Sequence, residues 1–191
     1  MRSGEDKVYG ERAVKVGKDL LGKFIVRKRG SKTLIGEITE VEVYVGPKDR
    51  AAHSFGGRIT PRNSVMYMRG GTAYVYFIYG MHWQMNVIVG GKDEPWGVLL
   101  RALQTPPAGK VAVGPGKLAR YLRLNKSFNG IDLVSSKKLW LEDRRVRIKK
   151  KSVVSAGRVG IDYAGTYWKN KRWRFYIKNS EHVSLKHQGV S

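Results

Sequence analysis

Residues 33–46 read TLIGEITEVEVYVG, a stretch that alternates between apolar and polar side chains over most of its length. Successive side chains of a β-strand point to opposite faces. Glu40, Glu42 and Tyr44 therefore share one face, and the valines that alternate with them share the other, which is the natural core face. Gly46 and Pro47 end the pattern. We predict a long strand here, with two carboxylates and a tyrosine on the face away from the valines.

Strand-like segments outnumber helical ones along the rest of the chain. We expect a first strand within residues 21–28 and further strands at 72–79, 85–89, 97–103, 153–159 and 172–177. Short helices are expected at 11–21 and 114–125, the second with Pro115 at its start. There is no internal repeat and no linker rich in Pro, Gly or Ser. The sequence therefore predicts one mixed, mainly β domain over residues 1–191.

The charge balance is the unusual feature of the composition. The chain has 37 Lys and Arg against 15 Asp and Glu, a net charge of +22 and a pI near 10.3. Such a surplus favours a polyanionic partner, either nucleic acid or an anionic membrane. No apolar run approaches the ~18 residues needed to span a bilayer, and the first residues lack the apolar core of a signal peptide. With no cysteine present, disulfides and a thiol nucleophile are excluded. We predict an intracellular nucleic-acid-binding protein without a membrane partner.

The charges are also unevenly placed. Residues 51–92 contain no Asp or Glu but include Arg58, Arg62 and Arg69, so phosphate oxygens could approach this stretch without repulsion. Residues 137–151 are rich in Lys and Arg as well, and we interpret that second run as a solvated loop.

Within the acid-free stretch, residues 74–86 read YVYFIYGMHWQMN. Flat, half-polar rings can stack on nucleic-acid bases, whereas an ordinary strand core would be built from Val, Ile and Leu. For Tyr74, Phe77 and Trp83 we expect packing in the core, because alternate positions of a strand must face it. Two functions remain open on these residues alone. A non-catalytic binding domain would use the rings as a platform, and a hydrolytic enzyme would add a carboxylate to activate water.

The order of short motifs is more specific than any one of them. The chain contains EVYVGP (42–47), DRAAHS (49–54), GGRITPRN (56–63), YVYFIYGM (74–81), LLRAL (99–103), GPGKL (114–118), NKSF (125–128) and AGRVG (156–160). From about residue 20 to about residue 184 the sequence resembles the alkyladenine (3-methyladenine) DNA glycosylase family. The resemblance implies an α+β domain built around a curved, mainly antiparallel β-sheet with a few flanking helices.

The resemblance also implies a reaction and its catalytic residues. It makes Glu42 the general base that activates a water, which attacks the sugar and displaces the base. Arg101 and the backbone carbonyl of Val159 match groups that help to hold that water. Arg101 could equally be a structural partner of Glu42. We expect Glu40 to be structural.

Family members extrude the damaged nucleotide and stack its base between aromatic rings, which here match Tyr44, His53 and Tyr76. Stacking recovers ~1–3 kcal/mol per base, and a cationic alkylated base gains further attraction from the rings. The remaining residues matched to base binding are Ala51, Asn86 and Leu99. Asn86 matches a position that disfavours the exocyclic amine of guanine, although it could also be an ordinary polar strand residue.

Contacts with the DNA around the extruded nucleotide are implied for a second set of residues. Tyr79 matches the ring that fills the gap left in the duplex. The others are Arg58, Thr60, Arg62, Met66, Met81, Lys117 and Lys126. The two lysines could also be only solvated charges.

The implied partner is double-stranded DNA containing damaged purines, of the 3-methyladenine, 7-methylguanine, hypoxanthine or ethenoadenine type. No metal or other cofactor is expected, because the histidines lack ligand spacing and cysteine is absent. No lysine is placed as a Schiff-base nucleophile, so we expect hydrolysis by a monomer without strand cleavage. The protein is expected in the cytoplasm of a bacterium or archaeon, associated with the nucleoid, or in a eukaryotic nucleus. A relative that binds lesions without cutting remains an alternative.

Overall fold

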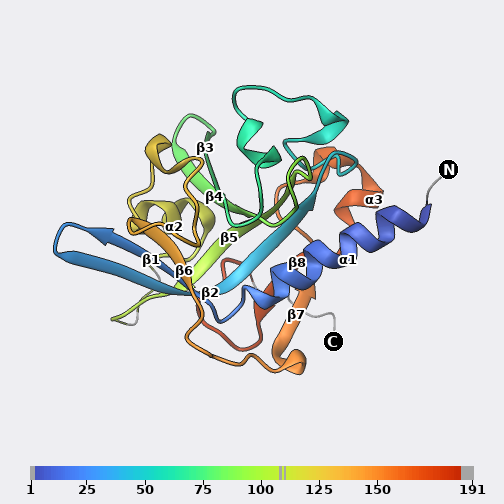
Figure 1. Cartoon of the computed structure of the whole chain (residues 1–191). Coiled ribbons are helices and arrows are strands. Elements are labelled where there is room, and N and C mark those ends of the chain that lie inside the picture. The colour runs from blue at the N-terminus through green and yellow to red at the C-terminus, as the bar shows by residue number, and fades with distance from the viewer. Residues whose placement is uncertain (1–2, 108, 110, 186–191) are drawn as a thin grey trace.

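The computed structural model describes residues 3–107, 109 and 111–185, with their side chains from residue 10 onward. Eight strands in this part of the chain form one curled antiparallel sheet (Figure 1). They are β1 (Phe24–Arg29), β2 (Lys32–Val45), β3 (Ala73–Ile78), β4 (His82–Ile88), β5 (Trp96–Gln104), β6 (Leu139–Glu142), β7 (Val153–Ala156) and β8 (Arg174–Ile177). The order is β3-β4-β5-β2-β1-β6, and β8 joins β2 to β7. The predicted fold class, a curved antiparallel sheet with flanking helices, is confirmed.

Strand β2 is the centre of the sheet. One of its edges pairs with β5, and the other pairs first with β1 and then, from Glu40 to Glu42, with β8. A register shift on the β5 side marks an irregularity at Glu40, as at a β-bulge. Val41 and Val43 are fully buried in the main core, which confirms the valine face as the core face.

Three α-helices flank the sheet in the described residues: α1 (Ser3–Asp19), α2 (Pro115–Tyr121) and α3 (Thr166–Lys169). Helix α1 packs closely against the valine face of β2 at Gly17. A β-carbon added at this position would lie only 2.5 Å from a Val43 methyl carbon. Close approach of this kind requires glycine. Helix α2 begins at Pro115 as predicted. None of the helices described has the length and apolar character needed to cross a membrane.

Three predictions about elements need correction. The first helix begins at Ser3 rather than at residue 11 and ends at Asp19. The sequence did not predict its first turns, because they contain glycines and no apolar periodicity. The basic run at 137–151 is not only a solvated loop, since β6 lies within it and pairs with β1. The strand expected at 153–159 ends at Ala156, and the residues that follow turn toward the site described next.

Candidate active site

The register of the sheet places residues from several strands in one row. Tyr74 of β3 pairs with Asn86 of β4, Asn86 pairs with Leu99 of β5, and Leu99 pairs with Glu42 of β2. On the far edge of β2, Glu42 pairs with Arg174 of β8. Directly opposite residues of neighbouring strands project from the same face of a sheet. The row therefore forms a floor that ends at a carboxylate.

A pocket lies over this floor. It contains every residue predicted to be catalytic or base-binding: Glu42, Tyr44, Ala51, His53, Tyr76, Asn86, Leu99, Arg101 and Val159. Met66 and Tyr79, predicted to contact DNA, also line it. The lining residues that sequence reasoning missed as site residues are Tyr74, Ile78, Gln84, Gly160, Ile161 and Tyr163. Strand alternation around Tyr76 could have indicated Tyr74 and Ile78, and the others had no such signal.

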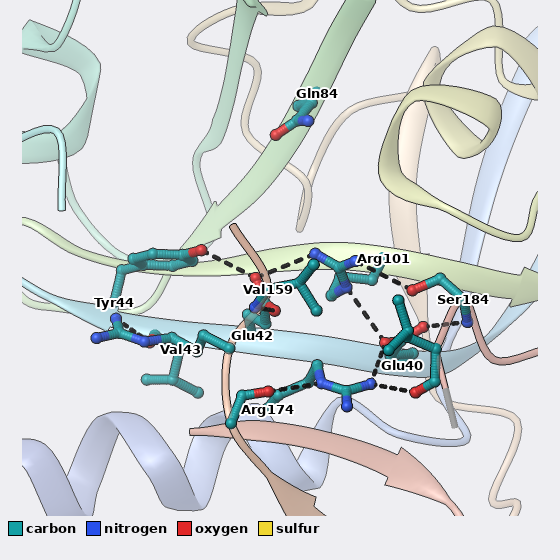
Figure 2. Close-up of polar contacts among 12 residues, drawn as sticks. Glu40, Glu42, Val43, Tyr44, Gln84, Arg101, Val159, Arg174 and Ser184 are labelled. Carbon is teal, nitrogen blue, oxygen red and sulfur yellow. Dashed lines mark hydrogen bonds and ion pairs between the residues drawn. The ribbon is translucent and has the colours of Figure 1, made fainter. Parts of the chain in front are cut away.

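Glu42 is fully buried and its carboxylate is held on both oxygens. The Val159 N–H donates to Oε1 at 2.7 Å, and the Tyr44 hydroxyl donates to Oε2 at 2.9 Å. Arg101 Nη1 lies 3.2 Å from the same Oε2 (Figure 2). The contacts fix the direction in which the carboxylate faces. Val159 reaches Glu42 through its N–H, and the role expected for its carbonyl remains a prediction.

Arg101 contacts two carboxylates of β2, those of Glu40 and Glu42. Its Nε lies 3.2 Å from Oε1 of Glu40, so the guanidinium bridges Glu40 and Glu42. Burial by itself would lower the pKa of Arg101, but the carboxylates of Glu42 and Glu40 outweigh it and raise the pKa above the ordinary arginine value. Arg101 therefore remains a cation beside Glu42. Glu40 does not line the pocket, and the structural role expected for it stays a prediction.

Aromatic rings form the pocket wall on the β3 side. The rings of Tyr74 and Tyr76 stack with centroids 4.9 Å apart, and His53 meets Tyr76 edge-on at 4.6 Å. His53 Nδ1 lies 3.0 Å from the Tyr74 hydroxyl oxygen. Although His53 is exposed at the pocket mouth, desolvation of its ring, with a smaller contribution from Arg62, lowers its pKa to about 4. The imidazole is neutral at pH 7.

The three aromatic residues expected in the core have different positions. Tyr74 is 1% exposed, but it belongs to the pocket wall rather than to the main core. Phe77 is 44% exposed, so its assignment to the core is wrong. It alternates with Tyr76 and so projects from the opposite face of β3. Trp83 packs against the main core as expected.

The tyrosine hydroxyls in the pocket are neutral hydrogen-bonding groups. Tyr76 donates to Gln84 Oε1 at 2.8 Å. Burial raises the pKa of Tyr76, and burial together with the nearby Glu42 raises that of Tyr44. Both phenols therefore keep their protons at neutral pH and can donate from otherwise apolar rings.

A buried ion pair lies next to this pocket, and nothing in the sequence had indicated it. Arg158 donates to Asp49 at 2.5 and 3.0 Å, and neither side chain is exposed. The Arg158 guanidinium lies 4.7 Å from the Tyr44 ring centroid. Asp49 also accepts from the Val45 and Ala51 N–H groups. The pair thus links the Tyr44 ring and the start of the 51–66 loop to Arg158, which directly precedes Val159 in the chain.

The turn between β3 and β4 projects from the pocket rim. Tyr79 is 73% exposed and Met81 66% exposed. Tyr79 and Gly80 have φ angles of 55° and 66°, and the Met81 N–H donates to the Ile78 carbonyl, as in the type I′ turns of hairpins. A positive φ is uncommon for a bulky residue. The chain therefore holds an exposed ring at this tip in a costly backbone conformation.

The other residues predicted to contact DNA lie outside the pocket lining, except Met66, which is buried in its wall. Asn63 organises the 58–62 loop by donating to the carbonyls of His53 and Arg58 and by accepting from Thr60. Arg62 donates to the Phe77 carbonyl at 3.3 Å. The exposed Lys117 and Lys126 stand on α2 and on a short 3-10 helix at Lys126–Phe128. No group of three or more His, Cys, Asp or Glu in the described chain could hold a metal ion.

Comparison with known proteins gives a consistent result. The model of the methylpurine-DNA glycosylase family matches residues 7–181. A protein of Borreliella burgdorferi (strain ZS7) is 41% identical over 177 residues, which cover 90% of this chain and 94% of that protein. One from Clostridium perfringens (strain 13 / Type A) is 39% identical, with 97% and 100% covered. Both carry the name "Putative 3-methyladenine DNA glycosylase".

Proposed function

The chain belongs to the methylpurine-DNA glycosylase family, and from this premise we propose that it removes alkylated or deaminated purines from double-stranded DNA by hydrolysing the N-glycosidic bond. The observation that carries the proposal is the position of Glu42. A buried carboxylate with both oxygens held stands at the end of a pocket floor, beside rings that suit a flat base.

The nucleotide must first leave the duplex, which costs a few kcal/mol and less for a damaged pair. Rings of Tyr44, Tyr76 and His53 receive the base, and each stacking contact recovers part of the cost. The neutral state of His53 suits a cationic alkylated base, because a protonated imidazole would repel it. Tyr79 enters the gap left in the duplex, which accounts for an exposed ring at the turn.

Glu42 then acts as general base. It accepts a proton from a water whose oxygen forms the new bond to the anomeric carbon, while the bond from that carbon to the purine nitrogen breaks and the base leaves with the electron pair. Arg101, Tyr44 and Val159 keep the carboxylate in one orientation. None of the described pocket-lining residues is a lysine, which supports hydrolysis without a Schiff base and without strand cleavage.

Incubation of the protein with 5′-labelled duplexes tests the proposal. The duplexes carry a single hypoxanthine, ethenoadenine or 7-methylguanine, and an undamaged duplex is the control. Strand breaks at the lesion are expected only after heating in alkali, because hydrolysis leaves an intact strand with an abasic site. Breaks without alkali would contradict simple hydrolysis. Tight binding of every lesion with no alkali-labile site would favour the alternative, a binding domain with an aromatic platform.

A further inference from the structure

Two carboxylates and two guanidinium groups alternate beneath the pocket. Arg101 lies 3.2 Å from both Glu42 and Glu40, and Arg174 Nη1 lies 2.9 Å from the same Glu40 oxygen that faces Arg101. None of the four side chains is more than 8% exposed. The series runs from the proposed general base to the far edge of β2 (Figure 2).

The far end of the series is closed by residues that are distant in sequence. The Ser184 N–H donates to Glu40 Oε2 at 2.6 Å, and Arg101 Nη2 donates to the Ser184 hydroxyl at 3.0 Å. Arg174 donates to the Leu185 carbonyl at 2.5 Å. The segment itself is anchored, because Thr39 donates to the His182 carbonyl and Val183 is buried beside Tyr176. The segment 182–185 therefore lies outside the sheet and accepts hydrogen bonds from Arg101 and Arg174.

Each of the three nitrogens of the Arg101 guanidinium has a partner in these contacts. Nε faces Glu40, Nη1 faces Glu42 and Nη2 faces Ser184, so the planar group cannot rotate without breaking at least one contact. Removing the Glu40 charge would leave Glu42 as its nearest carboxylate. A planar guanidinium can engage both oxygens of a carboxylate, and in that arrangement it would compete with water for the lone pairs of Glu42.

We propose that Glu40, Arg174 and the segment 182–185 form a positioning clamp that keeps Arg101 bridging the two carboxylates, so that Glu42 remains available to a water. The inference rests on the proposed function. Glu40, Arg174 and Ser184 do not line the pocket, so in this proposal they act only through Arg101. The clamp gives residues after β8 a role in the chemistry, although none of those that the structure describes, up to residue 185, lines the pocket.

Glu40→Gln keeps the shape of the side chain and removes its charge. We expect the single-turnover excision rate to fall about 10- to 100-fold, a range set by the cost of misplacing a catalytic group, with lesion affinity unchanged. The loss should therefore appear in the rate at saturating enzyme and not in the binding titration. A purely structural Glu40 would lower the melting temperature without changing the single-turnover rate of the folded protein.

Ser184→Ala carries the test if the Glu40 variant does not fold. It removes one hydroxyl from Arg101, and we expect a loss of about threefold to tenfold in single-turnover rate, corresponding to one net hydrogen bond. Thr72→Val is its matched control, because Thr72 is buried and donates a single hydrogen bond to the Arg69 carbonyl, outside the clamp. Its rate should equal that of the wild type.

The outcomes separate the clamp from the proposed function. Wild-type single-turnover rates for both Glu40→Gln and Ser184→Ala, in a protein that excises lesions, would overturn the clamp and leave the function standing. Equal losses in Ser184→Ala and Thr72→Val would also overturn it, because the effect would then be one of general stability. A wild-type protein that removes no lesion would refute the function, and the clamp with it.

Discussion

The carboxylate face of β2 and the turn between β3 and β4 border the same pocket but are built in opposite ways. Glu42 is fully buried, and every contact that orients it comes from the protein itself. Tyr79 is 73% exposed and has a positive φ. The contacts of Glu42 are formed in the absence of DNA. The turn, in contrast, holds an exposed ring in a backbone conformation that lowers the stability of the protein. Under the proposed function, this difference means that the catalytic carboxylate is preorganised, whereas the exposed ring finds its contacts only in the duplex.

The energetics explain why both arrangements persist. Buried charges are tolerated when each is paired and hydrogen-bonded, and Glu40 and Glu42 meet this condition through Arg101, Arg174 and backbone N–H groups. A non-glycine residue in the left-handed region costs about 1–3 kcal/mol and persists where the surrounding structure enforces it. Such strain concentrates at functional sites, which fits the proposal that Tyr79 enters the duplex.

The largest effect is expected from Glu42→Gln. A general base contributes ~10²–10⁴ in rate, so single-turnover excision should fall by that factor, while the retained shape leaves lesion affinity nearly unchanged. Excision by excess enzyme and a separate binding titration measure the two quantities. Normal excision by Glu42→Gln together with complete loss in Glu40→Gln would show that the roles of the two carboxylates had been exchanged.

Salt should separate the two regions almost as strongly. If about six phosphates are neutralised by the basic surface around the turn, the affinity for duplex should fall about a thousandfold between 50 and 200 mM salt. The single-turnover rate at saturating enzyme should change little, because Glu42 and Arg101 are buried and such charges are screened less by salt. An affinity that stays flat over this range would remove the electrostatic basis for DNA binding.

Asp49→Asn tests how far the stability of the protein depends on the pairing of its buried charges. It leaves Arg158 buried without a countercharge, and breaking such a pair costs about 3–5 kcal/mol in the free energy of unfolding. Asp143→Asn is the matched control, because its partner is Lys23 and its side chain is 59% exposed, so the loss should stay below about 1 kcal/mol. Denaturant unfolding of both variants measures the difference. Equal losses would show that burial does not distinguish these ion pairs.

The smallest effect, with the opposite sign, is expected at the turn. Asparagine tolerates the left-handed region better than tyrosine, so Tyr79→Asn should raise the free energy of unfolding by up to about 1 kcal/mol while it weakens retention of the extruded base. Met81→Asn, at an exposed neighbour without a positive φ, should not stabilise the protein. A Tyr79→Asn variant that is less stable than the wild type would mean that the ring supports the fold.

Local patterns in the sequence predicted seven of the eight strands, all but β6, and the face of β2 on which Glu40, Glu42 and Tyr44 lie. The alternation at 33–46 correctly separated Val41 and Val43 from Glu40 and Glu42, because strand geometry alone determines it. The ordered motifs then predicted the site residues through the family resemblance. The residues of the aromatic block at 74–86 also alternate between the two faces of a strand. Phe77 was nevertheless assigned to the wrong face, because aromatic rings occupy both faces there.

What could not be predicted depends on contacts between distant parts of the chain. Asp49 and Arg158 are 109 residues apart, and Glu40 and Ser184 are 144 apart. An isolated Asp or Ser in a loop carries no local pattern that names such a partner. For the same reason the sequence did not indicate that Glu40 and Glu42 are as fully buried as Val41 and Val43.

The central claim is that the pocket seats an extruded purine with its sugar beside Glu42. A crystal structure of Glu42→Gln bound to a duplex containing ethenoadenine tests it most directly, because this variant should bind the lesion without removing it. We predict the purine between Tyr44 and the wall formed by Tyr76 and His53, residue 42 facing a water about 3–3.5 Å from the anomeric carbon, and Tyr79 in the vacated gap. A lesion still stacked in the duplex, or a base bound away from residue 42, would contradict the account.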